Sequence, residues 1–340
     1  MSEGHRLAVS GGTSGSTGSP LRLRHDLRSV VREGVFSDRQ LAWAGYQRGE
    51  PRAWWRGDLV VPANTRQGPL WRANRAQNML MLSSYHLSEE TIESYRVALE
   101  QFDPVVIQAY PSSIGFLARY LESTGQVYRG KRLRGVITSS ETLLDEQRAS
   151  INRTMPCRVF DWYGGYERVA AIGTCEYGTL HLLSDYSYVE LPEAGDETCG
   201  LIGTAFFERA MPLIRYRTDD FVELGDNAQL CQCGREFPQV RRIAGRTGDS
   251  IRTPDGRVVA SLDHLFKGID FIAEAQIRQD KLDEVDIAVV PLAGFGDAEK
   301  NAILHKAHER LGHSVTVSIV TVESLPRTAN GKLRPVICSL

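Results

Sequence analysis

The chain has 340 residues, 42% of them hydrophobic and 24% charged, which is the composition of a globular protein and not of a disordered one. Its 40 basic and 42 acidic residues leave a formal net charge of −2, so we expect no general attraction to nucleic acid or to an anionic membrane. Because no apolar run approaches the roughly 20 residues that span a bilayer and no signal-peptide pattern opens the chain, we expect a cytoplasmic protein.

Glycine, serine and threonine dominate residues 10–20, which read SGGTSGSTGSP. The stretch lacks the lysine with which a Walker A loop neutralises phosphate charge. Its composition fits a flexible linker. It fits equally a mobile phosphate clamp, in which backbone N–H groups hold the anion together with the hydroxyls of Thr13, Ser14, Ser16 and Thr17. A clamp of this kind needs positive charge from elsewhere in the chain.

Residues 26–80 are rich in arginine and tryptophan, and their weak periodicity predicts few elements. The pattern sharpens from Leu87. Ser88 is the expected N-cap of a helix in which Ile92, Tyr95, Leu99 and Phe102 recur at helical spacing. Beyond it the sequence predicts a strand over 104–109, a helix over 112–121, a strand over 135–138, a helix over 144–152 and a strand over 158–162. Strands that alternate with helices indicate a parallel sheet.

Small, hydroxyl-bearing and acidic residues follow each of those three strands. The segments are AYPSS (109–113), TSSE (138–141) and WYGGYE (162–167). Any one of them fits an ordinary turn. Three in succession favour a binding site, because ligands of open α/β sheets bind at the carboxyl ends of the strands.

The second half of the chain changes character twice. Residues 180–225 predict short antiparallel strands, and after about residue 245 strands over 286–290 and 315–322 flank a helix that Asp297 is expected to cap and Gly312 to end. We therefore predict an α/β protein of two domains. Residues 1–245 form a large domain with a parallel βαβ sheet and an antiparallel segment, and residues 246–340 form a small mobile α+β domain hinged at 245–249 (GRTGD).

Eight motifs now stand in a fixed order along the chain. They read SGGTSGSTGSP, YPSS, SSE, WYGGYE, MPLIRYRTDD (211–220), CQCGR (231–235), IAGRTGD (243–249) and LPRTANGK (325–332). In this order they resemble the adenylate-forming enzyme superfamily, in its phenylacetate–CoA ligase and CapK-like branch, from residue 9 to the end. Each motif is weakly or moderately specific, and the specificity comes from the shared order.

The resemblance implies a nucleotide site. Its glycine- and hydroxyl-rich loop holds the β- and γ-phosphates of ATP in the resembled enzymes, and the matching residues are Thr13, Ser14, Gly15, Ser16, Thr17 and Gly18. The matches around the rest of the nucleotide are Ser139, Ser140, Glu141, Asp161, Tyr163, Gly164, Tyr166 and Asp220. Among them the resemblance implies Tyr163 near the adenine and Asp220 on the two ribose hydroxyls, which two carboxylate oxygens suit.

The resemblance also implies three catalytic residues. Glu167 matches a carboxylate that binds Mg²⁺, a hard cation that prefers oxygen ligands. Arg246 would reach the ribose or phosphate region from the joint between the domains. Lys332 would contact the α-phosphate and the attacking carboxylate, where a flexible ammonium group suits the charge that gathers at phosphorus. Taken alone, each residue fits a solvated or structural role better, and only the ordered motifs favour catalysis.

Four further residues have the spacing of a structural zinc site. Cys175 and His181 form C-x5-H, and Cys231 and Cys233 form C-x-C about fifty residues later. Three thiolates and an imidazole complete a tetrahedral zinc site with no open position. The alternative is a set of incidental cysteines, because C-x-C is tighter than the usual C-x2-C. Similar cysteines in the resembled branch favour zinc.

The function that the resemblance implies is a two-step ligase. A carboxylic acid reacts with MgATP to an acyl adenylate, and coenzyme A then takes the acyl group as a thioester. Tyr85, His86, Tyr110 and Tyr163 would suit an aromatic acid if they lined its pocket, and they fit core positions equally well. Relatives usually carry a substantial segment before the phosphate loop, so we expect the front of the large domain to be short for the family.

Three alternatives stay open at this stage. A stand-alone adenylation protein would load the thiol of a carrier protein instead of coenzyme A. A degenerate relative would bind nucleotide or a partner without turnover, although the retained Glu167, Asp220, Arg246 and Lys332 argue against decay. A zinc-dependent binding module would leave the nucleotide motifs unexplained. The sequence leaves the acid and the oligomeric state open.

Overall fold

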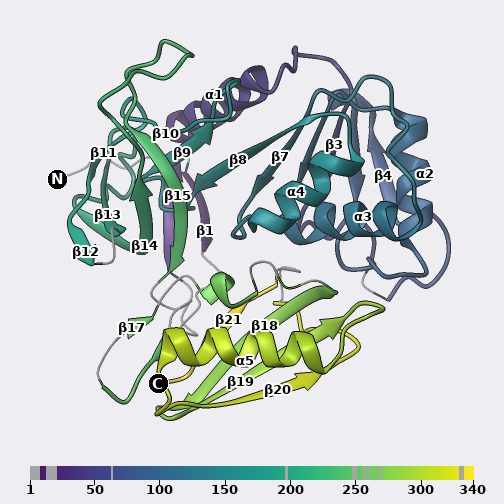
Figure 1. The fold of residues 1–340 in the computed structure, drawn as a ribbon. Coiled ribbons are helices and arrows are strands. Elements are labelled where there is room, and N and C mark those ends of the chain that lie inside the picture. The colour runs from purple at the N-terminus through teal and green to yellow at the C-terminus, as the bar shows by residue number, and fades with distance from the viewer. Residues whose placement is uncertain are drawn as a thin grey trace.

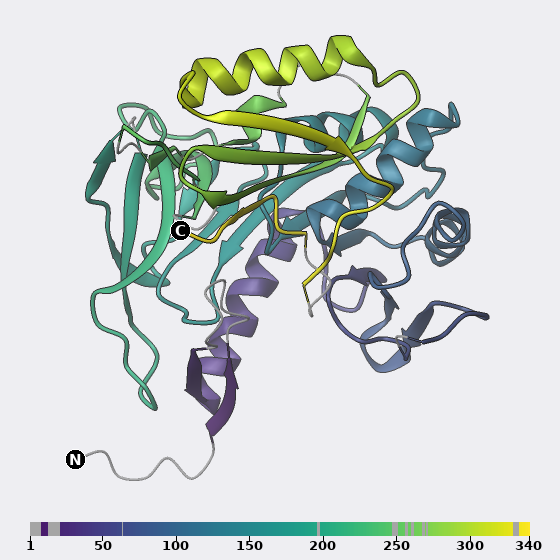
Figure 2. The same cartoon turned by 90° about the horizontal axis from the view of Figure 1, so that it is seen from below.

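The computed structural model describes residues 8–12, 21–62, 64–195, 198–246, 251–255, 258–259, 262–266, 269, 271–328 and 333–340. They form a large mixed sheet with helices on it, and a smaller sheet with one helix that lies below both halves of the large one (Figure 1). Seen from below, the small unit lies in front of them (Figure 2). The predicted α/β class, with its large and small sheets, is confirmed.

One half of the 13-stranded sheet is parallel. Its strands, in spatial order, are β5 (Met79–Leu82), β3 (Arg52–Trp55), β6 (Val106–Ala109), β7 (Gly135–Ser139) and β8 (Arg158–Gly164), with β4 (Trp71–Asn74) antiparallel at the outer edge and a 3₁₀ turn over Arg75–Gln77. Trp55, Ala109, Thr138 and Asp161 lie opposite one another in neighbouring strands and form one row across the sheet. The strands therefore reach their carboxyl ends together.

The other half is antiparallel. It runs on from β8 through β9 (Ala171–Thr174), β10 (Leu180–Leu182), β15 (Gln239–Arg246), β14 (Tyr216–Leu224), β13 (Thr198–Ala205) and β11 (Ser187–Glu190), with β12 (Glu193–Gly195) also paired to β13. The short antiparallel strands predicted for 180–225 are thus present. The segments before and after residues 13–20, β1 (Ala8–Gly12) and β2 (Arg22–Asp26), pair as a separate antiparallel hairpin.

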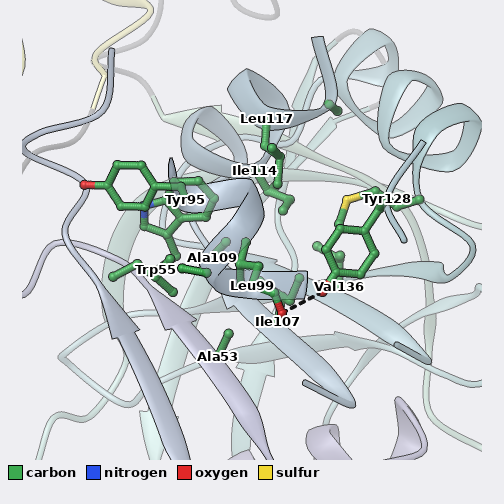
Figure 3. Packing of buried hydrophobic residues seen from close by; sticks show 14 of the residues in the cluster. Ala53, Trp55, Tyr95, Leu99, Ile107, Ala109, Ile114, Leu117, Tyr128 and Val136 are labelled. Atoms are coloured by element: carbon green, nitrogen blue, oxygen red, sulfur yellow. Dashed lines mark hydrogen bonds between the residues drawn. The ribbon is translucent and has the colours of Figure 1, made fainter. Parts of the chain in front are cut away.

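The core of the parallel half lies between the sheet and its crossover helices α2 (Ile92–Phe102), α3 (Pro111–Ser123) and α4 (Asp145–Thr154). Figure 3 shows Trp55 of β3 and Tyr95 of α2 stacked, with ring centroids 5.0 Å apart, beside Leu99, Ile107 and other fully buried side chains. The buried Tyr95 and Tyr128 hydroxyls donate to the backbone oxygens of Ser83 and Leu99, at 2.8 and 3.3 Å, so neither is left unpaired.

Two predicted helix starts are wrong by a few residues. The N-cap of α2 is Thr91 and not Ser88, because a turn closed by the backbone N–H of Thr91 on the Ser88 oxygen, at 3.1 Å, precedes the helix. The N-cap of α5 (Asp297–Leu311) is Gly296, whose N–H donates to Glu299 at 2.8 Å. Asp297 instead lies in the first turn, where its negative charge interacts favourably with the helix dipole. The predicted stop at Gly312, with φ +88°, is confirmed.

The longest helix, α1 (Leu27–Trp43), lies in the region where the sequence predicted few elements. The side chain of Asp26 caps it by accepting the Ser29 N–H at 2.9 Å. Its Phe36 and Trp43 pack against Tyr186 and neighbouring residues of the antiparallel half. Of its three buried residues, Ser29, Gln40 and Leu41, two are polar, so the spacing of apolar residues alone did not lead to this helix.

The small unit holds a second core. Its sheet runs β20 (Thr316–Thr321), β19 (Glu284–Pro291), β18 (Ile272–Lys281), β21 (Val336–Cys338), and α5 packs on it through the buried Ile303, Ala307 and Leu311. Shorter elements accompany it, namely β16 (Ile251–Arg252), β17 (Val258–Val259) and a 3₁₀ turn over Leu262–Leu265. Residues 247–249 of the predicted hinge lie outside the described residues, and the division into 1–245 and 246–340 stays a prediction.

None of the described helices combines the length and apolarity that crossing a bilayer requires. The cytoplasmic location stays a prediction.

Gly203 of β13 offers a test of how tightly the antiparallel half is packed. A Cβ at this position would stand 2.0 Å from the backbone oxygen of Val169, whereas nothing lies within 4 Å of a Cβ at the exposed Gly34 of α1. We expect Gly203→Ala to lower the free energy of unfolding by about 1–3 kcal/mol, and Gly34→Ala to raise it by about 0.5–1 kcal/mol. Urea unfolding measures both, and equal effects of the two alanines would contradict the packing.

Candidate functional site

The carboxyl ends of β6, β7 and β8 bring the three polar segments found in the sequence to one edge of the sheet, above the small unit (Figure 1). Tyr110 follows β6, Ser139 ends β7, and Tyr163 and Gly164 end β8. Ser140 has φ +71°, a left-handed conformation that non-glycine residues adopt at some cost and that gathers at functional sites.

Glu141 lies at the centre of this edge and connects three elements. It accepts the backbone N–H of Ser112 at 2.9 Å and the Ser112 hydroxyl at 3.0 Å, at the N-terminus of α3, where the helix dipole favours a carboxylate. It also accepts the N–H of Leu333, from the C-terminal unit, at 3.1 Å. Burial nevertheless raises the pKa of Glu141, against the lowering effect of these hydrogen bonds.

Tyr163 and Asp220 meet between the two halves of the sheet. The Tyr163 hydroxyl donates to Asp220 Oδ2 at 2.6 Å, and Asp220 is buried in β14. Asp220 lies opposite Arg246 in the pairing of β14 with β15, and the side chain of Arg246 lies outside the described residues.

The start of the glycine-rich loop lies against the WYGGYE segment. A Cβ on Gly11 would stand 2.2 Å from the Tyr166 hydroxyl, so only glycine fits beside that ring. On β2, beyond the loop, His25 packs edge-on against Tyr166 with ring centroids 4.7 Å apart. His25 in turn contacts the buried Glu208 through Nδ1 at 2.6 Å. The two strands that flank the loop are therefore fixed next to the residue that precedes Glu167.

Glu167 and its neighbours form a tight turn after β8. The Glu167 Oε2 atom lies over Gly165, 2.4 Å from the place of a Cβ there. Arg168 has φ +56° and donates to Ser29 of α1 at 2.7 Å, which ties the turn to the helix that follows β2. Two groups of predicted site residues lie outside the described residues: Thr13 to Gly18, and Lys332. Their roles stay predictions.

Asp161 lies in the sheet and not at its open edge. It is 8% exposed, its Oδ1 accepts the Thr138 hydroxyl at 2.7 Å, and its N–H donates to Thr174 at 2.8 Å. Burial raises the pKa of Asp161 to about 6, although the Thr138 hydrogen bond lowers it. A nucleotide-contacting role for Asp161 stays a prediction.

An ion cluster joins α3 to the small unit. Glu274 of β18 accepts a hydrogen bond from Arg327 at 2.6 Å, and Arg119 of α3 lies 3.9 Å from the same carboxylate oxygen. Burial lowers the pKa of Arg119. Together with the Glu141 contact to Leu333, this cluster connects the small unit to the large sheet and its helices.

The four predicted metal ligands come together. Their ligand atoms, from Cys175, His181, Cys231 and Cys233, all lie within 4.8 Å of one another, and Cys175 and His181 are fully buried. His181 Nδ1 lies 3.2 Å from the Phe237 oxygen, which leaves Nε2, 3.4 Å from Cys233 Sγ, facing the cluster. This donor set, with a backbone carbonyl fixing the imidazole, has the chemistry of a closed tetrahedral site.

Sequence reasoning missed one residue at the sheet edge, Arg56, because it did not predict β3. A signal was present: the apolar run AWW ends in RGD, a turn sequence. Of the predicted aromatic residues, the Tyr85 hydroxyl donates to the Gly57 oxygen at 3.0 Å, and His86 Nδ1 lies 2.8 Å from the Ser83 hydroxyl. The loop after β5 is thus hydrogen-bonded to the segment that contains Arg56.

The comparisons with known proteins agree with the motif order. Residues 251–339 match the CapK C-terminal domain family. The chain is 27% identical over 331 residues to protein CapK of Staphylococcus aureus, which covers 95% of this chain and 72% of CapK. It is 24% identical over 277 residues to a phenylacetate-coenzyme A ligase of Thermus thermophilus, covering 70% of this chain and 61% of the ligase, less than two thirds of its length. The resemblance to the phenylacetate–CoA ligase and CapK-like branch is confirmed.

Solved structures of 2-hydroxyisobutyryl-CoA ligase have the same fold. Its postadenylation state, in complex with R3-HIB-AMP, is 17% identical and superposes with a TM-score of 0.69, covering 98% of this chain and 74% of the ligase. Its thioesterification state, in complex with 2-HIB-AMP and CoA, gives a TM-score of 0.56 at 18% identity over 98% of this chain and 74% of the ligase.

The burial of Asp161 makes stability depend on pH in a defined direction. Its pKa is about 6 in the folded chain and roughly 3.9 in an unfolded one, so between these values only the folded state keeps the proton and stability falls as pH rises. In Asp161→Asn this dependence disappears. We expect the stability of the variant relative to the wild type to increase from pH 4 to pH 7 by on the order of 2 kcal/mol.

Urea unfolding at several pH values tests this, with the exposed Asp38→Asn as a control that leaves the pH dependence unchanged. A parallel pH dependence of Asp161→Asn and the wild type would contradict the assignment.

Proposed function

We propose that this protein activates a carboxylic acid with ATP to an acyl adenylate and then transfers the acyl group to coenzyme A. The observation that carries the proposal is the convergence at one sheet edge of the Tyr163–Asp220 pair, the turn of Glu167 and the base of the glycine-rich loop. The names of the similar ligases support coenzyme A as the acceptor over a carrier protein.

The roles follow from the chemistry of each group. Asp220 accepts the Tyr163 hydroxyl, and a carboxylate with two acceptor oxygens suits the ribose hydroxyls, while the Tyr163 ring would stack near the adenine. Backbone N–H groups of the loop after β1 hold the departing pyrophosphate. In the first step an oxygen of the acid attacks the α-phosphorus, the bond to pyrophosphate breaks, and Lys332 neutralises the charge that develops there.

Mg²⁺ fits this site through Glu167, a carboxylate on the turn next to the phosphate loop. When bound, the ion would screen the charge of the phosphate oxygens and orient them for in-line displacement.

The second step requires the small unit to turn. In the present arrangement Leu333 is bonded to Glu141, and the chain superposes better on the postadenylation state of 2-hydroxyisobutyryl-CoA ligase than on its thioesterification state. We interpret this as the arrangement for adenylation. Removal of Leu333 from the edge would give the thiol access to the acyl adenylate.

Exchange of labelled pyrophosphate into ATP measures the first step. We expect exchange that depends on an added carboxylic acid and falls by at least about 100-fold in Lys332→Ala, because the developing charge loses its counter-ion. Lys281→Ala, at an exposed lysine of the small unit, should retain full exchange. Wild-type protein that exchanges pyrophosphate with none of a panel of aromatic and aliphatic acids would contradict the proposal.

We also propose that Cys175, His181, Cys231 and Cys233 hold a structural zinc ion. Such an ion would join β9 and β10 to the loop before β15, next to the ion pair of Arg235 with Glu176, whose atoms lie 2.7 Å apart. Its position away from the sheet edge supports a structural and not a catalytic role.

Metal analysis of protein purified without chelator should find about one zinc per chain. We expect Cys233→Ser to lose most of the zinc and to lower the melting temperature, because three ligands hold the ion less tightly than four. Cys338→Ser, outside the cluster, should retain the zinc content of the wild type. Wild-type protein without zinc would refute this site.

A further inference from the structure

Arg56 is a partly buried cation to which neither the sequence motifs nor the proposed reaction assigns a role. It follows β3 directly, one row beyond Trp55, so it stands at the same sheet edge as Tyr110 and Ser139. Ser84 donates to its backbone oxygen at 3.0 Å, and Tyr85 to that of Gly57 at the same distance. These two hydrogen bonds hold the backbone from which the Arg56 side chain extends.

The guanidinium lies between two aromatic rings. Its central carbon is 4.8 Å from the ring centre of Trp54 and 5.8 Å from that of Tyr110, and one nitrogen donates to the hydroxyl of Ser140. Aromatic faces hold a guanidinium in place without using its N–H donors. The arginine is thus oriented, with donors left over.

The two nearest carboxylates are engaged elsewhere. Asp58 accepts the indole N–H of Trp54 at 2.5 Å, and Glu141 accepts from Ser112 and Leu333. Among the described residues, the one hydrogen bond of the Arg56 guanidinium goes to Ser140, a neutral hydroxyl. Burial lowers the pKa of Arg56, and the charges of Asp58 and Glu141, neither of which is hydrogen-bonded to it, oppose that shift only in part. Such a group favours an incoming anion.

The location separates this anion from the phosphates of ATP. The base of the phosphate loop lies against Tyr166, beyond the end of β8, whereas the guanidinium lies between the ends of β6 and β7. With strands about 4.8 Å apart, the two places are separated by one to two strand spacings, roughly 5–10 Å. The reacting carboxylate belongs at the phosphate end. An anion at Arg56 is therefore a second group of the same substrate, held among aromatic side chains that suit its carbon skeleton.

We infer that Arg56 binds a carboxylate at the far end of the acid substrate, so that the protein selects acids with a second anionic group over matched monocarboxylic acids. A bidentate carboxylate matches the fork of the guanidinium. This inference rests on the proposed acid activation for its biological meaning, but its test needs no turnover.

Equilibrium binding, measured by calorimetry without ATP, compares acids that differ by one carboxylate: succinate with butyrate, glutarate with valerate, and phthalate with benzoate. We expect the wild type to bind at least one diacid tenfold or more tightly than its monoacid partner. In Arg56→Met this preference should disappear, while the affinity for the monoacid stays within about twofold. Arg56→Lys should restore part of the preference. Arg72→Met, at an exposed arginine, serves as the control.

Equal binding of mono- and diacids by the wild type, or binding of none, would overturn the inference. So would an equal loss of both acids in Arg56→Met, which would place Arg56 on the reacting carboxylate. The proposed activation is tested separately. Diacid binding without pyrophosphate exchange would contradict the proposed reaction and support the anion site. Pyrophosphate exchange that is equally efficient with monoacids and diacids would support the reaction and contradict the anion site. Circular dichroism confirms that each variant is folded.

Discussion

The carboxylate of Glu141 is the point on which the arrangement of this protein depends. It lies partly buried where the ends of β6 and β7 meet the N-terminus of α3, and a carboxylate withdrawn from water is stable only when its oxygens are hydrogen-bonded. One of its partners is the backbone N–H of Leu333, from the small unit. A single side chain thus completes the helix terminus, the sheet edge and the contact between the two parts of the chain.

The register of the parallel strands forms the sheet edge at which Glu141 lies. Trp55, Ala109, Thr138 and Asp161 stand in one row, so the residues that follow them emerge together. Parallel strands place their carboxyl ends on one side, and the antiparallel half then continues the sheet from β8, which brings Asp220 to Tyr163. The mixed sheet therefore joins the polar motifs of the first half of the chain to those of the second.

The described contacts that Glu141 and Glu274 make with the other part of the chain are polar, which suits the proposed rotation of the small unit. Glu274 receives Arg327 from its own unit and approaches Arg119 from α3. Hydrogen bonds and ion pairs of this kind can be exchanged for water more readily than a packed apolar surface, since interfaces within a chain that are small and polar allow relative motion. The cluster of Cys175, His181, Cys231 and Cys233, by contrast, brings the ends of β9 and β10 together with the loop before β15.

The sequence alone determined the elements with strong apolar periodicity and the residues that belong to recognisable motifs. The helices and strands from Ile92 to Gly164 follow from apolar spacing, and the C-x5-H and C-x-C pairs predicted the cluster that the fold assembles. It did not lead to α1, whose buried residues are Ser29, Gln40 and Leu41, or to β3, whose short apolar run before a turn sequence was overlooked. Only the tertiary structure decided which polar residues meet. Asp161 and Glu141 lie twenty residues apart in the sequence, yet one is enclosed in the sheet and the other lies at its edge, and Arg56 joins that edge from β3, a strand distant in the sequence. Those outcomes depend on register and strand order, which are set by packing across the whole sheet and not by neighbours along the chain.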